Sequence, residues 1–262
     1  MSTANVLLAA HGIGKRFGGV RALHDVTLTI RAGEIYGLIG PNGAGKTSFF
    51  NVMTGLYRAD HGHFTFAGKP LDCSAPHRVA AAGIARTFQN IRLFANMTAL
   101  ENVMVGRHLK SRSGVLGAIL RTAATRAEEE ALQRRAVELL HYVGIGDRAN
   151  QLARHLSYGD QRRLEIARAL ATEPCLLALD EPAAGMNATE TAALRRLVQG
   201  LRNDGLTVLL IEHDVKLVMG LCDRVAVLDY GEKIAEDAPA EVQRNPKVIE
   251  AYLGGSVGEV HA

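Results

Sequence analysis

Short apolar runs recur along this chain, separated by longer segments in which apolar residues follow a helical period. The runs 34–39, 175–180 and 206–211 carry few polar residues, which is typical of strands buried on both faces of a parallel sheet. The segments 48–53 and 187–202 predict helices, the second with Asn187 as its cap and Glu190 in its first turn. The alternation of buried strands with helices predicts an α/β fold.

A second kind of strand shows alternating apolar and polar residues, as in Val-Thr-Leu-Thr-Ile over 26–30. The segments 6–10 and 63–67 are similar, and this period indicates strands with one buried face. The remaining elements that the pattern predicts are a short helix over 75–82 opening at Pro76, a strand over 83–89, a strand pair over 224–229 and 233–236 around Gly231, and two short helices within 239–253.

The character of the chain changes between residues 97 and 140, where no strand-like run appears. Residues 99–105 have a helical pattern, and 121–140 are rich in Ala, Glu and Arg with apolar residues near the helical period. A break at 111–114 and a small apolar stretch over 114–120 separate the two segments. We therefore expect a helical insert in the α/β framework.

Composition narrows the class of protein only a little. The chain has 262 residues, 47% of them hydrophobic, which is ordinary for a globular protein. Its net charge is +3, and it contains no run of Lys or Arg that would indicate a nucleic-acid partner. Its three cysteines form no Cys-x-x-Cys pair, so neither a zinc site nor a disulfide framework is expected. No apolar run approaches the roughly 18 residues that a membrane span needs. If the protein serves a membrane, we expect it to be a peripheral subunit.

The most specific local motif is Gly-Pro-Asn-Gly-Ala-Gly-Lys-Thr over 40–47, which fits the phosphate-loop pattern at every fixed position. It lies between a predicted strand and a predicted helix, where such a loop turns its backbone N–H groups toward a phosphate chain. Lys46 is expected to reach the β and γ phosphates, and Thr47 to bind Mg²⁺ through its hydroxyl. The expected nucleotide-binding segment is Gly40, Pro41, Asn42, Gly43, Ala44, Gly45, Lys46, Thr47 and Ser48.

Acidic and imidazole side chains follow two of the predicted buried strands. Asp180 and Glu181 end the first, at the edge of an open α/β sheet where ligands bind. One carboxylate can hold Mg²⁺ and the other can orient or deprotonate an attacking water. His213 follows the second strand and is either a structural residue or a contact to a γ-phosphate.

Two further positions carry open alternatives. Phe17, before a Gly-Gly turn, is either a core residue or a stacking partner for a purine base. Ser157 and Asp160 match a capping box before a strong helix predicted over 161–171. Such a capped helix end is also a second candidate phosphate site.

These motifs, in this order and over nearly the whole chain, resemble those of the ATP-binding subunits of ABC transporters. Residues 40–47 match Walker A, 176–181 match Walker B with its catalytic glutamate, and 156–160 match the signature motif. The resemblance makes Gln89 the Q-loop glutamine and His213 the switch histidine, and it favours adenine stacking for Phe17. It implies Glu181, His213, Gln89 and Lys46 as catalytic residues, Thr47, Gln89 and Asp180 as Mg²⁺ ligands, and Ser157 and Gly159 as additional ATP contacts.

The fold implied by the resemblance is a P-loop NTPase (RecA-like) core with an antiparallel β subdomain and an α-helical insert subdomain. Within a single cassette over 1–262, residues 1–90 and 174–236 are expected to form the core with its β subdomain. Residues 91–173 are expected to form the helical subdomain, and 237–262 a C-terminal helical tail.

In this family two cassettes pack head to tail around two ATP molecules, each signature helix facing the nucleotide of the other subunit. The implied partners are a second, related cassette, transmembrane permease subunits and, through these, a periplasmic or extracellular substrate-binding protein. The implied location is the cytoplasmic face of the bacterial inner membrane. The features that look like the branched-chain amino acid uptake group are Tyr158, the segments 87–90 and 183–187, the insert around 111–120 and the tail over 245–253. Within 183–187, Asn187 stands where many relatives have Asp.

Several alternatives stay open at this point. Relatives that import urea, amides or other amino acids look much the same. A soluble ABC ATPase would usually carry two cassettes or a long coiled-coil insert, and neither feature is visible in the sequence. A P-loop GTPase would need an Asn-Lys-x-Asp stretch, which is not found. A non-catalytic regulatory module is disfavoured by Glu181 and His213.

The signature motif departs from the family pattern at Asp160, which replaces the usual Gln. We expect the Asp160 carboxylate to turn away from phosphate or to pair with Arg162 or Arg163.

Overall fold

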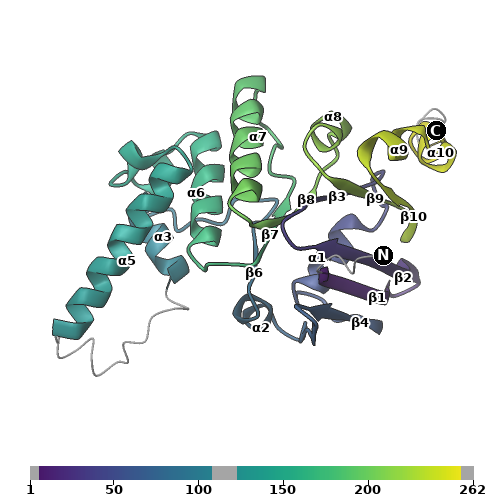
Figure 1. Cartoon of the computed structure of the whole chain (residues 1–262), viewed down its shortest axis with the longest axis horizontal. Coiled ribbons are helices and arrows are strands. Elements are labelled where there is room, and N and C mark those ends of the chain that lie inside the picture. Colours follow the sequence, from purple (N-terminus) through teal and green to yellow (C-terminus); the bar gives the residue numbers. More distant parts are fainter. Residues whose placement is uncertain (1–5, 108–122, 255–262) are drawn as a thin grey trace. The chain divides into compact units, whose positions relative to one another are not determined.

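The computed structural model describes residues 6–107 and 123–254 (Figure 1). Within that range the chain divides into two compact units. The first contains the residues up to Arg86, Cys175–Ala183 and the residues from Ala192 onward, and the second contains Thr87–Pro174 and Ala184–Thr191. The predicted break at 111–114, the stretch over 114–120 and the start of the helix predicted over 121–140 lie outside the described residues.

The first unit contains a six-stranded sheet with the order β10-β9-β3-β8-β7-β6. Its strands are β3 (Ile35–Ile39), β6 (Ile84–Arg86), β7 (Leu176–Asp180), β8 (Thr207–Ile211), β9 (Arg224–Asp229) and β10 (Glu232–Asp237). All neighbours are parallel except β9 and β10. Every residue of β3, β7 and β8 is buried, which confirms the prediction of central parallel strands from their apolar runs.

The same unit contains a four-stranded antiparallel sheet with the order β2-β1-β4-β5. Its strands are β1 (Val6–Phe17), β2 (Val20–Arg31), β4 (His61–Phe66) and β5 (Lys69–Pro70). The predicted strands over 6–10 and 26–30 were too short, because pairing of β1 with β2 continues to Phe17 and Val20 through several register shifts. These bulges interrupt the alternation by which the pattern marks a strand.

The strand predicted over 83–89 was also wrong in its length, since β6 ends at Arg86. The backbone N–H of Phe88 donates to the Glu165 carboxylate, and its carbonyl accepts from Arg162, so neither group pairs with a strand. Gln89 therefore lies in a loop.

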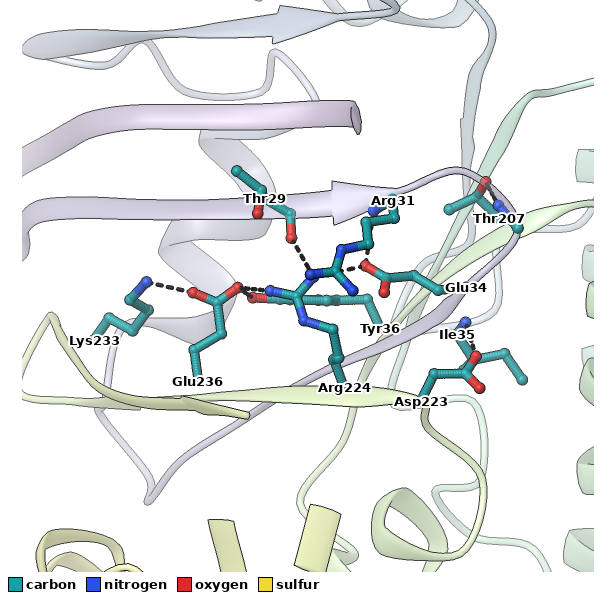
Figure 2. Close-up of polar contacts among 11 residues, drawn as sticks. Thr29, Arg31, Glu34, Ile35, Tyr36, Thr207, Asp223, Arg224, Lys233 and Glu236 are labelled. Atoms are coloured by element: carbon teal, nitrogen blue, oxygen red, sulfur yellow. Dashed lines mark hydrogen bonds and ion pairs between the residues drawn. The ribbon is translucent and has the colours of Figure 1, made fainter. Parts of the chain in front are cut away.

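A polar network joins β2, β3, β9 and β10 at the edge of the core (Figure 2). Arg224 donates to the Thr29 carbonyl at 3.1 Å, to Glu34 Oε1 at 3.1 Å and to Glu236 Oε1 at 2.6 Å. The Tyr36 hydroxyl donates to the same Glu236 oxygen at 2.8 Å. Burial, and then the Glu236 charge, raise the pKa of Tyr36 well above its usual value, so this hydroxyl stays a donor.

The helices of the first unit lie between and after its strands. They are α1 (Lys46–Met53), α2 (Pro76–Ala81), α8 (Val215–Met219), α9 (Pro239–Arg244) and α10 (Pro246–Gly254), and α7 (Ala188–Asn203) also contributes most of its length to this unit. Phe49 and Phe50 of α1 are fully buried in the main hydrophobic core, together with residues of both sheets. The core thus fixes the helix that begins at the phosphate loop.

The second unit is helical, as the insert prediction requires. Its elements are α3 (Ala99–Arg107), α5 (Ala123–Tyr142), the 3-10 turns η2 (Gly146–Arg148) and η3 (Ala153–His155), and α6 (Tyr158–Leu170). Helix α3 packs closely on α6, since a side chain at Gly106 would overlap the Arg168 carbonyl. Across residues 6–107 and 123–254, no helix combines the length and apolar character needed to cross a bilayer.

Candidate nucleotide site

The loop over 40–45 connects β3 to α1, as predicted, and two of its glycines are sterically required. A Cβ atom at Gly40 would overlap the carbonyl oxygen of Leu228 in the neighbouring strand β9. One at Gly45, whose φ is 100°, would lie 2.6 Å from the Ala22 carbonyl oxygen. The backbone can therefore follow this tight path only without side chains at these positions.

Lys46 lies inside the curve of this loop. Its Nζ donates to the Gly40 carbonyl at 2.6 Å and to the Pro41 carbonyl at 2.9 Å, and the residue is 7% exposed. Burial lowers the pKa of Lys46, and the charges of Glu181 and Asp180 oppose that shift. The ammonium group is thus held near two carboxylates by contacts to neutral carbonyls, which a phosphate oxygen can replace.

The acidic pair lies at the carboxyl end of β7, where the α/β pattern predicts a ligand site. Asp180 is the last residue of the strand and is buried. Glu181 has a φ of 45°, which is uncommon for a residue with a side chain, and its N–H donates to the Ile211 carbonyl at 2.9 Å. The bond to the end of β8 holds this strained turn in place.

His213 follows β8, the strand next to β7, so the sheet order places it beside the acidic pair. Its Nδ1 lies 3.6 Å from Glu181 Oε2 and 3.8 Å from Glu212 Oε2, and its side chain is 58% exposed. The histidine is therefore not a core residue, and it adjoins the carboxylate predicted to orient water.

Glu212 is a site residue to which sequence reasoning assigned no role. It is fully buried, and its carboxylate accepts the N–H groups of Ala183 at 2.9 Å and His213 at 3.2 Å. Burial raises the pKa of Glu212, while these N–H bonds and the His213 charge oppose the rise. The Glu212 carboxylate therefore connects the loop after β7 with the loop after β8. Its only sequence signal is an acid directly after a buried strand.

Phe17 ends β1 and is 41% exposed, so the core alternative for this residue is excluded. Its ring packs edge-on against Tyr57, with centroids 5.2 Å apart, and Lys15 Nζ lies 5.4 Å from its centroid. A partly exposed aromatic ring can pack against a flat ligand. Stacking on adenine remains a prediction.

The signature residues lie in the second unit, at the start of α6. The Ser157 hydroxyl accepts from the Asp160 N–H at 3.2 Å, which confirms the predicted cap. The Asp160 carboxylate lies 3.9 Å from Arg163 NH1, one of the two predicted partners. A Cβ at Gly159 would lie 2.6 Å from Glu190 Oε1, so the Glu190 side chain of α7 lies against this glycine.

Gln89 also belongs to the second unit, and there the structure reveals partners that the sequence did not predict. The buried Arg162 donates to the backbone carbonyls of Phe88 and Gln89. Nothing in the local sequence distinguishes Arg162 from the adjacent Arg163, because both follow the same capped helix start. The Mg²⁺ contact predicted for the Gln89 side chain stays a prediction.

Comparison with known proteins agrees with this arrangement. The family model described as ABC transporter matches residues 23–184, and the model described as branched-chain amino acid ATP-binding cassette transporter matches residues 232–257. The high-affinity branched-chain amino acid transport ATP-binding protein LivG of Salmonella typhimurium is 48% identical over 250 residues, covering 95% of this chain and 98% of that relative.

Two solved structures extend the likeness to the fold. An ATP-binding cassette of an ABC transporter in its ADP conformation has a TM-score of 0.82 at 32% identity, covering 95% of this chain and 99% of that one. A dimeric cassette in a post-hydrolysis state, bound to ADP and Pi, has a TM-score of 0.74 at 27% identity, covering 89% and 99%.

The sheet order and the glycine loop with its lysine define a P-loop NTPase. This chain belongs to the ABC transporter family, as an ATPase cassette of the branched-chain amino acid transport group.

Proposed function

We propose that this chain binds ATP with Mg²⁺ and hydrolyses it in a head-to-tail pair with a second cassette, and that this powers uptake of branched-chain amino acids through separate membrane subunits. The observation that carries the proposal is the common location of the Lys46 loop and the pair formed by Glu181 and His213. They follow β3, β7 and β8, three adjacent parallel strands of one unit.

The phosphate loop fits a triphosphate by its own geometry. Two of its glycines lie too close to neighbouring carbonyls to carry side chains, and Lys46 already donates to the carbonyls of the first two loop residues. Backbone N–H groups at the start of α1 and the Lys46 ammonium supply the charge that holds β and γ phosphates. Asn42, Gly43, Ala44, Thr47 and Ser48 complete the binding segment.

The residues available for Mg²⁺ fit a hard cation that is bound jointly by protein and phosphate. Thr47 is exposed in the first turn of α1, and Asp180 ends β7. Gln89 is the third predicted ligand. Oxygen donors in small number are typical of magnesium sites that include substrate phosphates. A bound magnesium ion supplies positive charge opposite the transferring phosphoryl group.

The chain's own part in hydrolysis falls to Glu181 and His213. The Glu181 carboxylate is mostly shielded, and its backbone is fixed at the sheet edge, so it can orient a water molecule and take up its proton. The exposed His213 can contact both this carboxylate and a γ-phosphate oxygen. Phe17 completes the site by stacking on the base.

The second half-site is formed by Ser157 and Gly159 at the N-terminus of α6. This helix end presents N–H groups and a capping hydroxyl, and we propose that it binds the nucleotide held by the other cassette. Support comes from the relative that was solved as a dimer with ADP and Pi. ATP then favours the closed pair, and hydrolysis releases it.

The proposed partners are a related but different cassette, permease subunits and an external binding protein, with this chain at the cytoplasmic face of the bacterial inner membrane. The match of residues 232–257 to the branched-chain amino acid cassette model and the similarity to LivG support this assignment. The permeases and the binding protein would select the substrate.

The test uses the complex co-purified with its permeases and reconstituted in vesicles. Glu181→Gln should retain ATP binding and lose turnover and leucine uptake together, and the exposed Glu129→Gln serves as the control. Normal hydrolysis by Glu181→Gln would show that the catalytic assignment is wrong. Turnover that responds to urea or an amide, and not to leucine, would reject the proposed substrate.

A further inference from the structure

Arg162 is a buried charged residue for which the proposed hydrolysis has no direct use. It lies in the second turn of α6 and is 3% exposed. Its NH1 donates to the Phe88 carbonyl at 2.6 Å, and its NH2 donates to the Gln89 carbonyl. One guanidinium group therefore fixes two consecutive peptide groups of the loop that carries Gln89.

Glu165, one turn further along α6, completes this contact. It is 1% exposed, its Oε1 accepts the Phe88 N–H at 3.2 Å, and its Oε2 accepts from Arg162 NH1 at 3.3 Å. Burial raises the pKa of Glu165, whereas the Phe88 N–H and the charges of Arg162 and Arg168 oppose the rise. Phe88 is thus held through both its N–H and its carbonyl, which makes the loop segment rigid relative to α6.

The same guanidinium also reaches the signature motif. Arg162 NH2 donates to the Tyr158 hydroxyl at 3.0 Å. The Tyr158 ring also lies beside the loop before α7, because a Cβ built at Gly185 would be 3.3 Å from its Cε1 atom. Tyr158 occupies the third position of the 156–160 motif, next to Gly159. All of these residues belong to one compact unit.

We propose that Arg162 is a positioning residue that couples the signature segment to Gln89, so that engagement of Ser157 and Gly159 with the partner's nucleotide fixes the loop that presents Gln89. The inference rests on the proposed function, since it takes the roles of Gln89 and of the signature segment from there. Only an arginine fits, because a planar group with several fixed donors can serve two carbonyls, a hydroxyl and a carboxylate together. A lysine keeps the charge but lacks this geometry.

The test is a double-mutant cycle in the complex assembled with its permeases and second cassette. Arg162→Lys should lower kcat for ATP about tenfold when Gln89 is present and less than twofold in the Gln89→Ala background. The KM for ATP should change by less than about twofold, because the phosphate loop is unaltered. The matched control is Arg107→Lys, because Arg107 lies in the same unit and bonds to Glu173 at 2.7 Å. It should leave kcat unchanged in both backgrounds.

Independent, multiplicative losses in the double variant would overturn the inference, since Arg162 would then act through general stability. A Gln89→Ala variant with normal kcat would also overturn it.

If Arg162→Lys fails to fold, Tyr158→Phe takes its place, because it removes only the hydroxyl that accepts from Arg162. It should lower kcat about threefold with the same dependence on Gln89. Glu181→Gln separates the two proposals: if it abolishes turnover while the cycle is multiplicative, only the Arg162 inference fails.

Discussion

The Nδ1 atom of His213 lies 3.6 Å from Oε2 of Glu181, although the two residues are 32 positions apart and follow different strands. Strands β7 and β8 are parallel neighbours, with Asp180 opposite Ile211, so the residues that follow them meet at one edge of the sheet. This pairing brings an exposed imidazole to the carboxylate that is proposed to orient water.

Replacing His213 with Ala should lower kcat for ATP by about a hundredfold in the assembled complex, because the proposed polar contact to the transferring phosphate is lost. Nucleotide affinity should change little, since the phosphate loop is intact. Steady-state ATPase assays with a nucleotide titration measure both. His63→Ala, which alters an imidazole stacked on His11 in the antiparallel sheet, is the control. An unchanged kcat in His213→Ala would remove His213 from the mechanism.

Replacing Gly40 with Ala should weaken ATP binding at least tenfold, because the added Cβ overlaps the Leu228 carbonyl and displaces the loop. Equilibrium titration with a fluorescent ATP analogue measures this effect. Gly33→Ala is the matched control, since Gly33 has a φ of 76° but open space around it. It should cost only about 1 kcal/mol of stability. Equal binding losses in both variants would contradict the steric argument.

Replacing Asp160 with Gln should lower the KM for ATP about threefold, because the proposed composite site would lose a carboxylate near the partner's phosphates. The effect is expected to be small, since Asp160 also lies 3.9 Å from Arg163 and so already has a cationic neighbour. The measurement is ATPase activity of the assembled complex at varied ATP. A KM and kcat identical to those of the unaltered complex would show that Asp160 does not affect the composite site.

Replacing Arg224 with Ala should lower the free energy of unfolding by about 3 kcal/mol, because Glu34 loses its ion-pair partner in a mostly buried network and Glu236 keeps only Lys233 as a cationic partner (Figure 2). Urea unfolding followed by circular dichroism measures the change. Arg78→Ala, which breaks an exposed pair with Asp72, should cost much less, because solvent screens this pair. Similar losses in the two variants would mean that burial does not determine the strength of these pairs.

The buried Glu212 predicts a pH dependence of stability. Its folded-state pKa lies above the ordinary 4.5 because of burial, so the folded state binds this proton more tightly than the unfolded state does. The free energy of unfolding should therefore fall as pH rises from 4.5 to the raised pKa, by at most about 1.4 kcal/mol per pH unit from this group.

Glu212→Gln removes that contribution. Its amide NH2 would face the His213 N–H, which lowers stability by an amount that does not depend on pH. Melting temperatures from pH 4.5 to 7 should show the variant gaining stability relative to the unaltered protein as pH rises. Glu129→Gln, at an exposed position, should show no such trend. A constant difference across the range would contradict the prediction.

Features that depend only on neighbouring residues follow from the residue order alone. The run over 35–39, the glycines of 40–45 and the helix from Lys46 are contiguous, so pattern and motif specify strand, loop and helix together. The Ser157 cap follows for the same reason, since its partner N–H is three residues away. Even here, the length of β1 was underestimated because its bulges break the alternation.

Which distant groups meet depends on how the strands and helices pack. The order of β3, β8 and β7 places His213 beside Glu181, and packing of α6 against the loop after β6 distinguishes Arg162 from Arg163 and ends that strand at Arg86. A local pattern records the period and the polarity of a segment. It does not record which buried donor will satisfy a carbonyl far along the chain, because that depends on how the strands and helices pack.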